Sequence, residues 1–270
     1  MTLTATIRPT ANVLISTFIL TGRLLVNSIR NPVGSLTNLI IAAFFFVIYL
    51  GGLGGSANFS MLGGGNYATF LLPTAVVFAS AGGSSTGLLL VEDIQSGYLR
   101  RILAMPVSRF AAIAAPVLVG GVQVLLQVAA IVVIGFVVGA GSATGFIGII
   151  TMVAIAFVWG MFLAAISAAV ALTTGNAQAT QSATLLLFPL IFMSPAFVPR
   201  ADLQTWLRYI ASANPTTYVL EGMRSVLLPH GGVGHVVTAF TVSGGLLLLA
   251  IWWATSSARS VVGGSRGGKG

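Results

Sequence analysis

The chain has 270 residues, of which 6% are charged and 56% are hydrophobic, and its mean hydropathy is +1.01. A soluble domain carries about 25% charged residues, so this composition excludes a water-covered globule and favours an integral membrane protein. The formal net charge is +8, but the 12 basic residues form no cluster, which makes nucleic-acid binding a poor interpretation. Cysteine is absent, and this excludes disulfides, thiolate metal sites and cysteine nucleophiles.

Residues 1–35 predict a cytoplasmic tail followed by an amphipathic helix. Arrangement on a helical wheel separates apolar from polar residues, a pattern typical of a helix lying in the membrane interface. The alternative, a short seventh crossing, is disfavoured by Arg23. The apolar face holds Leu14, Phe18, Leu25 and Ile29, and the polar face holds Ser16, Arg23, Asn27 and Arg30.

Two stretches contain no Asp, Glu, Lys or Arg: Asn31 to Val91 and Phe110 to Pro199. A bilayer core about 30 Å thick needs roughly 20 apolar helical residues per crossing, so the first stretch has room for two crossings and the second for three. With one more near the C-terminus, we expect an all-α polytopic membrane protein with six transmembrane helices. The expected crossings are about Leu36–Gly54, Tyr67–Leu90, Ala112–Gly139, Gly145–Leu172, Ser182–Val198 and Val236–Thr255.

A charged segment, residues 91–109, separates the second crossing from the third. Its acidic residues come first and its arginines later, an order that suits the helix macrodipole. We therefore expect a short amphipathic helix that begins at the acidic pair Glu92 and Asp93 and ends before Pro106. An ordinary surface helix would explain the order of charges, but not why a minimal loop carries a whole helix.

The connection between the fifth and sixth crossings, residues 199–234, carries signals for two short helices. Asp202 is a candidate cap for the first, and Asn214 followed by proline predicts the start of the second. In the second helix, Glu221 and Arg224 are three residues apart and are expected to pair. Because both helices carry apolar residues, we expect a re-entrant pair that dips into the outer membrane surface.

Lys and Arg are unevenly divided between the two sides of the predicted membrane. Nine of the 12 lie in the N-terminal segment, the second-to-third connection and the C-terminal tail, and three lie in the fifth-to-sixth connection. Since cytoplasmic loops carry the excess of basic residues, both termini are predicted to be cytoplasmic in a multi-pass protein of the cell membrane. Residues 36–255 would form the transmembrane domain, and residues 256–270 a flexible basic tail.

Two motifs occur in order and on the predicted sides of the membrane. The inner one consists of Glu92-Asp93, Gly97, Arg100-Arg101 and Pro106-Val107-Ser108-Arg109, and the outer one of Phe197-Val198-Pro199, Trp206, Asn214-Pro215 and Arg224. With these motifs the chain resembles the permeases of type-2 ABC exporters, above all the daunorubicin-resistance (Drr) branch. With the interfacial N-terminus and six crossings, the resemblance extends over nearly the whole chain.

The resemblance implies that the inner segment is a coupling helix that docks on a cytoplasmic ATPase subunit. It also implies two ABC ATPase subunits and a second permease, identical or homologous, as partners within the membrane lipids. ATP and Mg²⁺ would then be bound by the ATPase, and no cofactor is expected on this chain. The coupling residues implied are Glu92, Asp93, Ile94, Gly97, Tyr98, Arg100 and Arg101.

Several motifs of other function classes are missing. Lys269 is the only lysine, so there is no Walker-type loop, and ATP hydrolysis is expected on a separate polypeptide. We predict no catalytic residues and no metal site, since His230, His235 and Glu221 are better explained as a solvated loop. The alternative function is a secondary transporter or channel without an ATPase partner. A proton-coupled carrier keeps ionisable residues inside its bundle, and the expected crossings contain none.

The cargo is expected to be an amphipathic drug or a lipid-like molecule, because an ionic solute would need charged partners inside the bundle. The export direction is implied by the family resemblance. We expect the path to lie between two permeases, along the first, second and fifth crossings. The candidate path residues are Asn38, Phe44, Ser84, Ser85, Phe188 and Met193.

Overall fold

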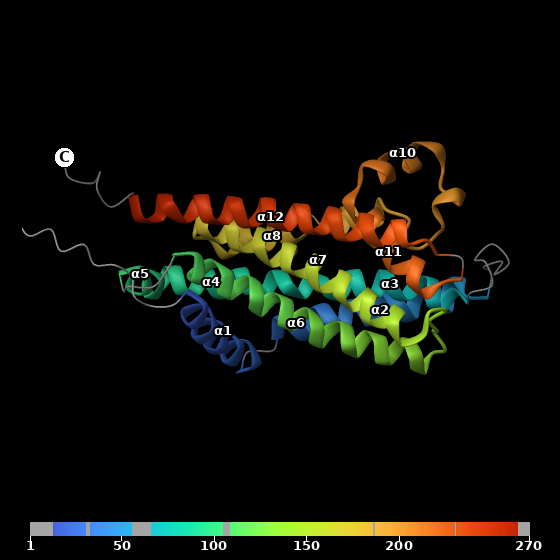
Figure 1. Ribbon diagram of the computed structural model, residues 1–270, viewed down its shortest axis with the longest axis horizontal. Helices are drawn as coiled ribbons and strands as arrows, with labels where there is room; N and C mark the ends of the chain where they lie inside the picture. The colour runs from blue at the N-terminus through green and yellow to red at the C-terminus, as the bar shows by residue number, and fades with distance from the viewer. Residues whose placement is uncertain are drawn as a thin grey trace, which may run out of the picture.

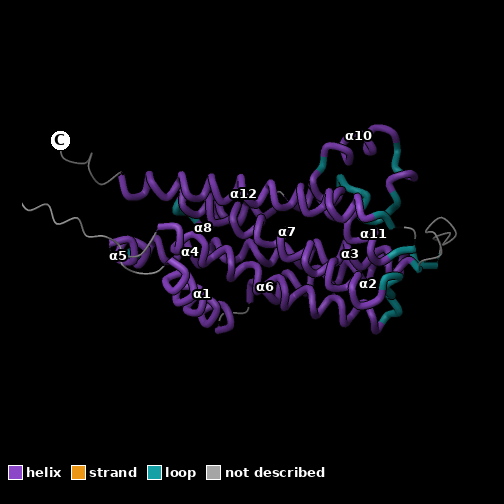
Figure 2. The backbone as a smooth tube through the Cα atoms, viewed as in Figure 1, coloured by secondary structure: helices purple, strands orange, loops and turns teal. Residues whose placement is uncertain are grey.

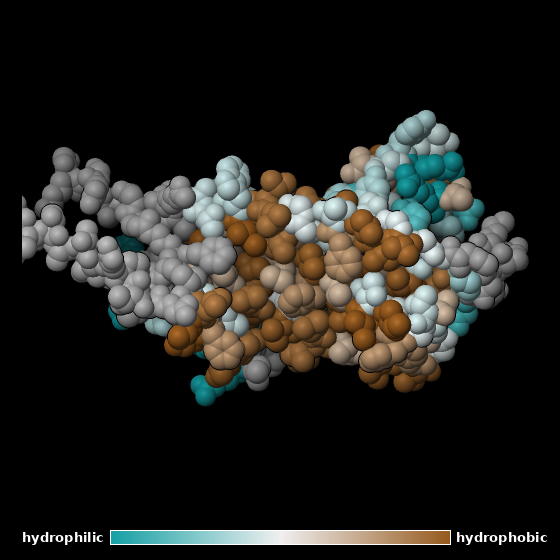
Figure 3. Space-filling view, in the orientation of Figure 1, coloured by the Kyte–Doolittle hydropathy of each residue, from teal (hydrophilic) through white to brown (hydrophobic). Residues whose placement is uncertain are grey.

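The structure is a computed structural model, and it describes residues 13–30, 33–55, 66–104, 109–185, 187–229 and 231–263. In this part of the chain all regular elements are helices, and the long ones run side by side in an elongated bundle (Figure 1, Figure 2). The middle of the bundle surface is apolar, whereas hydrophilic residues gather at the end that carries α10 (Thr205–Ala213) (Figure 3). An apolar middle next to a polar end suits a chain that crosses a bilayer.

Five segments of the described chain are long and apolar enough to cross a membrane, and they match the first, second, third, fourth and sixth predicted crossings. The all-α polytopic membrane fold is therefore confirmed. The elements concerned are α2 (Val33–Leu53); α3 (Tyr67–Ser80) with η2 (Ala81–Ser85) and α4 (Thr86–Gln95); α6 (Arg109–Val137); α7 (Gly145–Thr174); and α12 (Val233–Gly263). Since α12 continues to Gly263, the predicted flexible tail does not begin at residue 256.

The predicted fifth crossing, Ser182–Val198, falls on two shorter helices, α8 (Ala177–Leu185) and α9 (Leu187–Phe192). α9 contains a proline, which lacks a backbone N–H, and a tight turn follows in which the Ala196 N–H donates to the Ser194 carbonyl (2.7 Å). Neither helix has the length of a spanning helix. A count of six crossings therefore stays a prediction.

The second crossing is interrupted by η2, a five-residue 3-10 helix between α3 and α4. A Cβ on Gly83 in this segment would lie 2.6 Å from the carbonyl oxygen of Gly160 in α7. Glycine thus lets the two backbones come together, as small residues do at membrane helix interfaces. The Ser167 hydroxyl of α7 donates to the Ser84 carbonyl (2.6 Å), so this contact also satisfies a backbone acceptor at the interruption.

The N-terminal helix, α1 (Val13–Arg30), lies beside α6 (Figure 1). Its Leu24 packs with small side chains of α6. Leu14 and Phe18 are 77% and 80% exposed, which fits a helix whose apolar face meets lipid; its place in the membrane interface stays a prediction. Ser16, which the sequence pattern places on the polar face of this helix, is buried.

At the other end, η3 (Arg200–Asp202), α10 and α11 (Pro215–Leu227) form the connection that precedes α12. The Asn214 side chain accepts a hydrogen bond from the Thr216 N–H (3.0 Å), and proline opens α11, so the predicted start of this helix is confirmed. The predicted Asp202 cap is wrong, because Asp202 lies in the 3-10 turn and Gln204 precedes α10. The apolar face of α11 is buried against α3, α7 and α12.

Candidate functional site

The inner end of the bundle, which the sequence predicts to be cytoplasmic, contains a sharp turn between α4 and α5 (Tyr98–Ala104). α4 closes with the Ser96 N–H donating to the Glu92 carbonyl (2.9 Å). Gly97 then has a φ of +70°, a left-handed conformation that costs a residue with a Cβ about 1–2 kcal/mol. Glycine is therefore favoured at the point where the chain turns into α5.

The acidic pair does not begin a helix, contrary to the sequence prediction. Glu92 and Asp93 lie in the last turn of α4, the helix that forms the final part of the second crossing. The reason is that the apolar face of α4 continues through Val91 to Ile94, which packs on a buried apolar cluster. The predicted end of the inner helix at Pro106 lies outside the described residues.

Arg23 of α1 joins the ends of α4 and α5. Its Nη2 donates to Oδ1 of Asp93 (2.8 Å) and its Nη1 to Oδ2 (3.3 Å), a bidentate ion pair. The guanidinium also lies over the Tyr98 ring, 3.7 Å from its centroid, in a cation–π contact. We call Arg23, Asp93, Gly97 and Tyr98 the inner joint, because one guanidinium there connects three helices.

The electrostatics of the inner joint keep Arg23 charged. Partial burial lowers the pKa of the Arg23 guanidinium, but the hydrogen bond and charge of Asp93, with a smaller effect of Tyr98, outweigh it, so that the pKa is raised overall. The Arg23 side chain is 38% exposed, and ion pairs at such positions contribute about 0–1 kcal/mol to stability. The pair therefore serves mainly to orient α1 relative to α4 and α5.

A buried apolar cluster supports the inner joint from the membrane side. It brings residues of α4 and α5 together with residues of α6, α7 and α12, so movement of the joint is resisted by the bundle. Gln95 adds a polar contact, since its Nε2 donates to the Gly175 carbonyl (3.2 Å) in the turn after α7. The cluster consists of Leu90, Val91, Leu99, Ile113, Ala168, Ala169, Ala171, Leu172 and Ala254.

The seven implied coupling residues divide into two groups. Glu92, Arg100 and Arg101 are exposed, so their charges are accessible to another protein. Asp93, Ile94, Gly97 and Tyr98 are partly buried in contacts or the turn within the chain. Arg23 was not among the residues implied for coupling, and its only sequence signal is a charge on a helix that is otherwise mostly apolar.

A second polar contact ties the end of α1 to the second crossing. Gln123 of α6 donates through Nε2 to the Ser28 hydroxyl of α1, and its Oε1 accepts from the Ser85 hydroxyl of η2 (2.9 Å). Gln123 and Ser28 are both buried, where paired polar groups are the rule. α1 is thus bonded both to the inner joint and to the interruption of the second crossing.

The six candidate path residues lie in different surroundings within the described part of the chain. Ser84 is buried in the contact with α7, Ser85 bonds to Gln123, and Phe188 lies beside Phe78 with ring centroids 5.8 Å apart. Phe44 and Met193 are exposed and Asn38 is partly exposed. An apolar cavity of about 400 Å³ lies elsewhere, between α1, α6, α7 and α12. The assignment of a path to these six residues stays a prediction.

At the outer end, Arg224 of α11 is buried and bonded to neutral acceptors. Nε donates to the Phe70 carbonyl (3.1 Å) and Nη1 to the Pro195 carbonyl (2.5 Å), while Nη2 donates to the Ala196 carbonyl (2.7 Å) and the Thr74 hydroxyl (3.2 Å). The guanidinium also stacks on the Phe70 ring, 3.6 Å from its centroid. Arg224 therefore fastens α11 to α3 and to the turn after α9.

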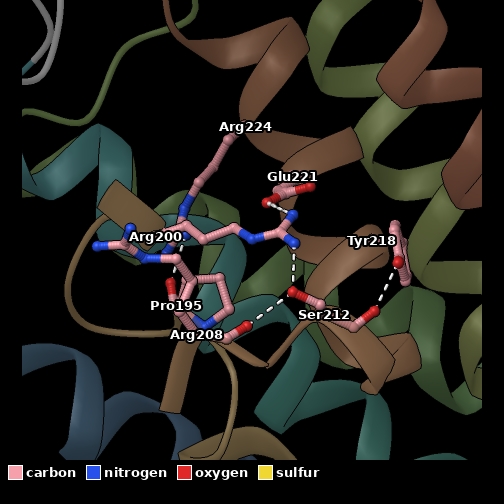
Figure 4. A network of polar contacts seen from close by, with 7 residues as sticks. All are labelled: Pro195, Arg200, Arg208, Ser212, Tyr218, Glu221 and Arg224. Carbon is pink, nitrogen blue, oxygen red and sulfur yellow. Dashed lines mark hydrogen bonds and ion pairs between the residues drawn. The ribbon is translucent and has the colours of Figure 1, made fainter. Parts of the chain in front are cut away.

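Glu221 pairs with a residue other than the one predicted. Its Oε1 accepts from Nη1 of Arg200 (3.3 Å), and Nη2 of Arg200 donates to the Ser212 hydroxyl (2.6 Å) (Figure 4). The predicted Glu221–Arg224 pair is wrong, because the Arg224 side chain turns inward to the carbonyls of α3 and the turn. His235, considered for a metal site, is exposed, and His230 lies outside the described residues.

Comparison with known proteins identifies the family of the chain. The sequence profile described as ABC-2 type transporter matches residues 15–228. The chain belongs to the ABC-2 type transporter family. This ABC-2 match includes α1, the inner joint and the outer helices within one family region, and it confirms the resemblance seen in the two sequence motifs.

Individual relatives agree with the ABC-2 assignment. The chain is 27% identical over 183 residues to the daunorubicin resistance ABC transporter permease protein DrrB1 of Streptomyces coeruleorubidus, covering 67% of this chain and 65% of that relative. It is 30% identical over 212 residues to the putative transport permease ycf38 of Cyanophora paradoxa, covering 77% and 72%. It is 23% identical over 209 residues to the probable doxorubicin resistance ABC transporter permease protein DrrC of Mycobacterium tuberculosis, covering 77% and 75%.

Proposed function

We propose that this protein is the permease subunit of an ATP-driven exporter, which moves an amphipathic drug or a lipid-like molecule out across the cell membrane. The observation that carries the proposal is the inner joint of an ABC-2 family chain, in which one arginine connects α1, α4 and α5. On this proposal both termini are cytoplasmic and the inner joint faces the cytoplasm. The exposed charges of Glu92, Arg100 and Arg101 would then meet an ATPase subunit.

The inner joint is suited to transmit a push into the membrane. α5 is joined to α4 through the turn at Gly97, and α4 continues directly into the second crossing. A force on α5 would therefore move α4 and α1 together, because the Arg23–Asp93 pair and the Tyr98 contact link them. Such a rigid-body shift of packed helices is a common form of conformational change.

The proposed assembly contains two ATPase subunits and two permeases, the second permease being identical or homologous to this chain. ATP and Mg²⁺ would be bound by the ATPases. Support for the substrate class comes from two relatives named for daunorubicin and doxorubicin resistance. It also comes from the five spanning segments, which are apolar throughout most of their length, a surface that suits an amphipathic molecule entering from the bilayer.

Transport in reconstituted vesicles tests the proposal. The permease is purified with the ATPase that accompanies it and placed in proteoliposomes, and uptake of a fluorescent anthracycline into vesicles with the ATPase outside is followed. The proposal predicts uptake that needs hydrolysable ATP and continues when a protonophore removes the proton gradient. Uptake that needs no ATPase and stops with the protonophore would instead identify a secondary transporter.

A further inference from the structure

The outer end of the bundle contains a pocket with charged side chains in its lining, and the proposed transport function does not use it. It has a volume of about 310 Å³ and lies between the start of α12, α11 and the turns before α10. We call it the outer pocket. Its lining consists of Phe70, Pro195, Pro199, Arg200, Glu221, Arg224, Ser225, Leu228, Pro229, Gly231 and His235.

The charges lining the outer pocket do not balance. Arg200 and Arg224 contribute two positive charges and Glu221 one negative charge, so with neutral histidine the pocket has an excess of one positive charge. Glu221 pairs with Arg200, and the four acceptors that bind Arg224 are all neutral. No carboxylate of the described residues is paired with the buried Arg224 at ion-pair distance, and the one charge of Glu221 offsets only one of the two arginines. Buried positive charge that is not balanced is costly, so an anion entering the pocket would be stabilised there.

The hydrogen-bonding groups of the pocket also favour an anion. The carbonyls of Phe70, Pro195 and Ala196 already accept from Arg224, which leaves them less able to bind a cation. The donors that remain are mainly on arginine, and four bonds occupy four of the five N–H groups of Arg224.

The two arginines that line the outer pocket differ in how exposed their side chains are. Arg224 is 7% exposed and cannot move away from its acceptors without breaking its four hydrogen bonds. The Arg200 side chain is 36% exposed and its partner Glu221 is 21% exposed, so Arg200 can exchange its contact with Glu221 for another anion while its hydrogen bond to the Ser212 hydroxyl remains. A guanidinium recognises phosphate oxygens through paired N–H groups.

We propose that the outer pocket binds a phosphate group of net negative charge, one that carries no cationic group of its own, with Arg200 as the direct ligand, Arg224 as the buried positive charge beneath it and Glu221 as the group that the phosphate displaces. The phosphate can belong to a lipid headgroup or be a free anion, and the apolar side chains of Phe70 and Leu228 suit a lipid. The site is a property of the permease alone and does not rest on ATP coupling.

Binding is measured on the purified full-length permease in nanodiscs of zwitterionic lipid, by microscale thermophoresis. The probes are lyso-phosphatidylglycerol, lyso-phosphatidylcholine and inorganic phosphate. We expect lyso-phosphatidylglycerol to bind saturably, at least about tenfold more tightly than lyso-phosphatidylcholine, and to weaken as ionic strength rises. If inorganic phosphate also binds and responds to the variants below in the same way, the ligand of the pocket is a free anion. If only the lysolipid binds, the ligand is a lipid headgroup.

Three variants separate a binding role from a structural one. Arg200→Gln should weaken lyso-phosphatidylglycerol binding about tenfold, and Glu221→Gln should strengthen it several-fold, because the competing carboxylate is gone. Arg208→Gln is the matched control, since this exposed arginine bonds to the Ala201 and Leu203 carbonyls and does not line the pocket. Equal binding of the two lysolipids, equal losses in Arg200→Gln and Arg208→Gln, or weaker binding by Glu221→Gln would overturn the proposal.

Discussion

Arg224 shows how a single residue can hold irregular backbone together at the edge of a membrane bundle. Near membrane depth, backbone groups that leave a helix need partners within the protein. The turn after α9 exposes the Pro195 and Ala196 carbonyls, and Arg224 supplies N–H donors to both while also bonding to Phe70 of α3. The residue thus replaces the backbone donors that a continuous helix would have provided.

Removing the Arg224 guanidinium should destabilise the protein. The Arg224→Gln variant leaves buried carbonyls without donors, and each such group costs about 1–3 kcal/mol. We expect a clear fall in the unfolding temperature of the protein in detergent micelles. Arg208→Gln is the control and should stay within about 0.5 kcal/mol of the parent. Equal unfolding temperatures for the two variants would contradict the role of Arg224 as a fastening residue.

Between elements, the turn from α4 to α5 depends on Gly97. An alanine at this position would not clash, because its Cβ would meet nothing within 4 Å. It would, however, disfavour the positive φ that the backbone adopts there. We expect Gly97→Ala to cost about 1–2 kcal/mol and to misalign α5. Gly22→Ala is the matched control, since Gly22 is within α1, also has free space and should gain up to about 1 kcal/mol.

Thermal unfolding and limited proteolysis near α5 check this pair of variants. Gly97→Ala should lower the unfolding temperature and increase cleavage after the arginines of α5, whereas Gly22→Ala should do neither. If the two alanine variants behave alike, the turn does not require the left-handed conformation.

The elements that the sequence predicted well are those whose structure depends on local composition. Long apolar runs predicted α2, α6, α7 and α12, and Asn214 before proline predicted the start of α11. The prediction failed at Glu92, where the acidic pair was taken as the start of a new helix. A helix continues past the membrane boundary as long as its apolar face still has a neighbour, and Ile94 provides that face.

Local sequence patterns did not predict the contacts between distant parts of the chain. Arg23 and Asp93 are 70 positions apart, and no periodicity within either helix predicts their pairing. The same holds for Arg200 and Glu221, since spacing along one helix had favoured Arg224 as the partner instead. Such pairs are decided by how helices pack, which a single sequence does not display.

At the scale of the whole molecule, α1 connects the inner end of the bundle to its middle. Through Arg23 it bonds to the inner joint, and through Ser28 and Gln123 it reaches η2 in the second crossing. The interruption at η2 is a position where a spanning helix can change its geometry, as 3-10 segments within helices often do. A displacement of α5 can therefore be transmitted into the membrane segment in two ways, through α4 directly and through the hydrogen bonds that connect α1 to η2.

Coupling through the inner joint is the central claim, and a charge swap tests it most directly. The measurement is substrate transported per ATP hydrolysed in proteoliposomes containing the permease and its ATPase, with Arg208→Glu as a control at the outer end. Asp93→Arg should lower this ratio several-fold, because it places two cations together. The double variant Arg23→Asp with Asp93→Arg should restore the ratio part-way, because the ion pair forms again but the cation–π contact of Arg23 with Tyr98 is lost. A ratio unchanged by Asp93→Arg, or a double variant no better than the single one, would contradict the account.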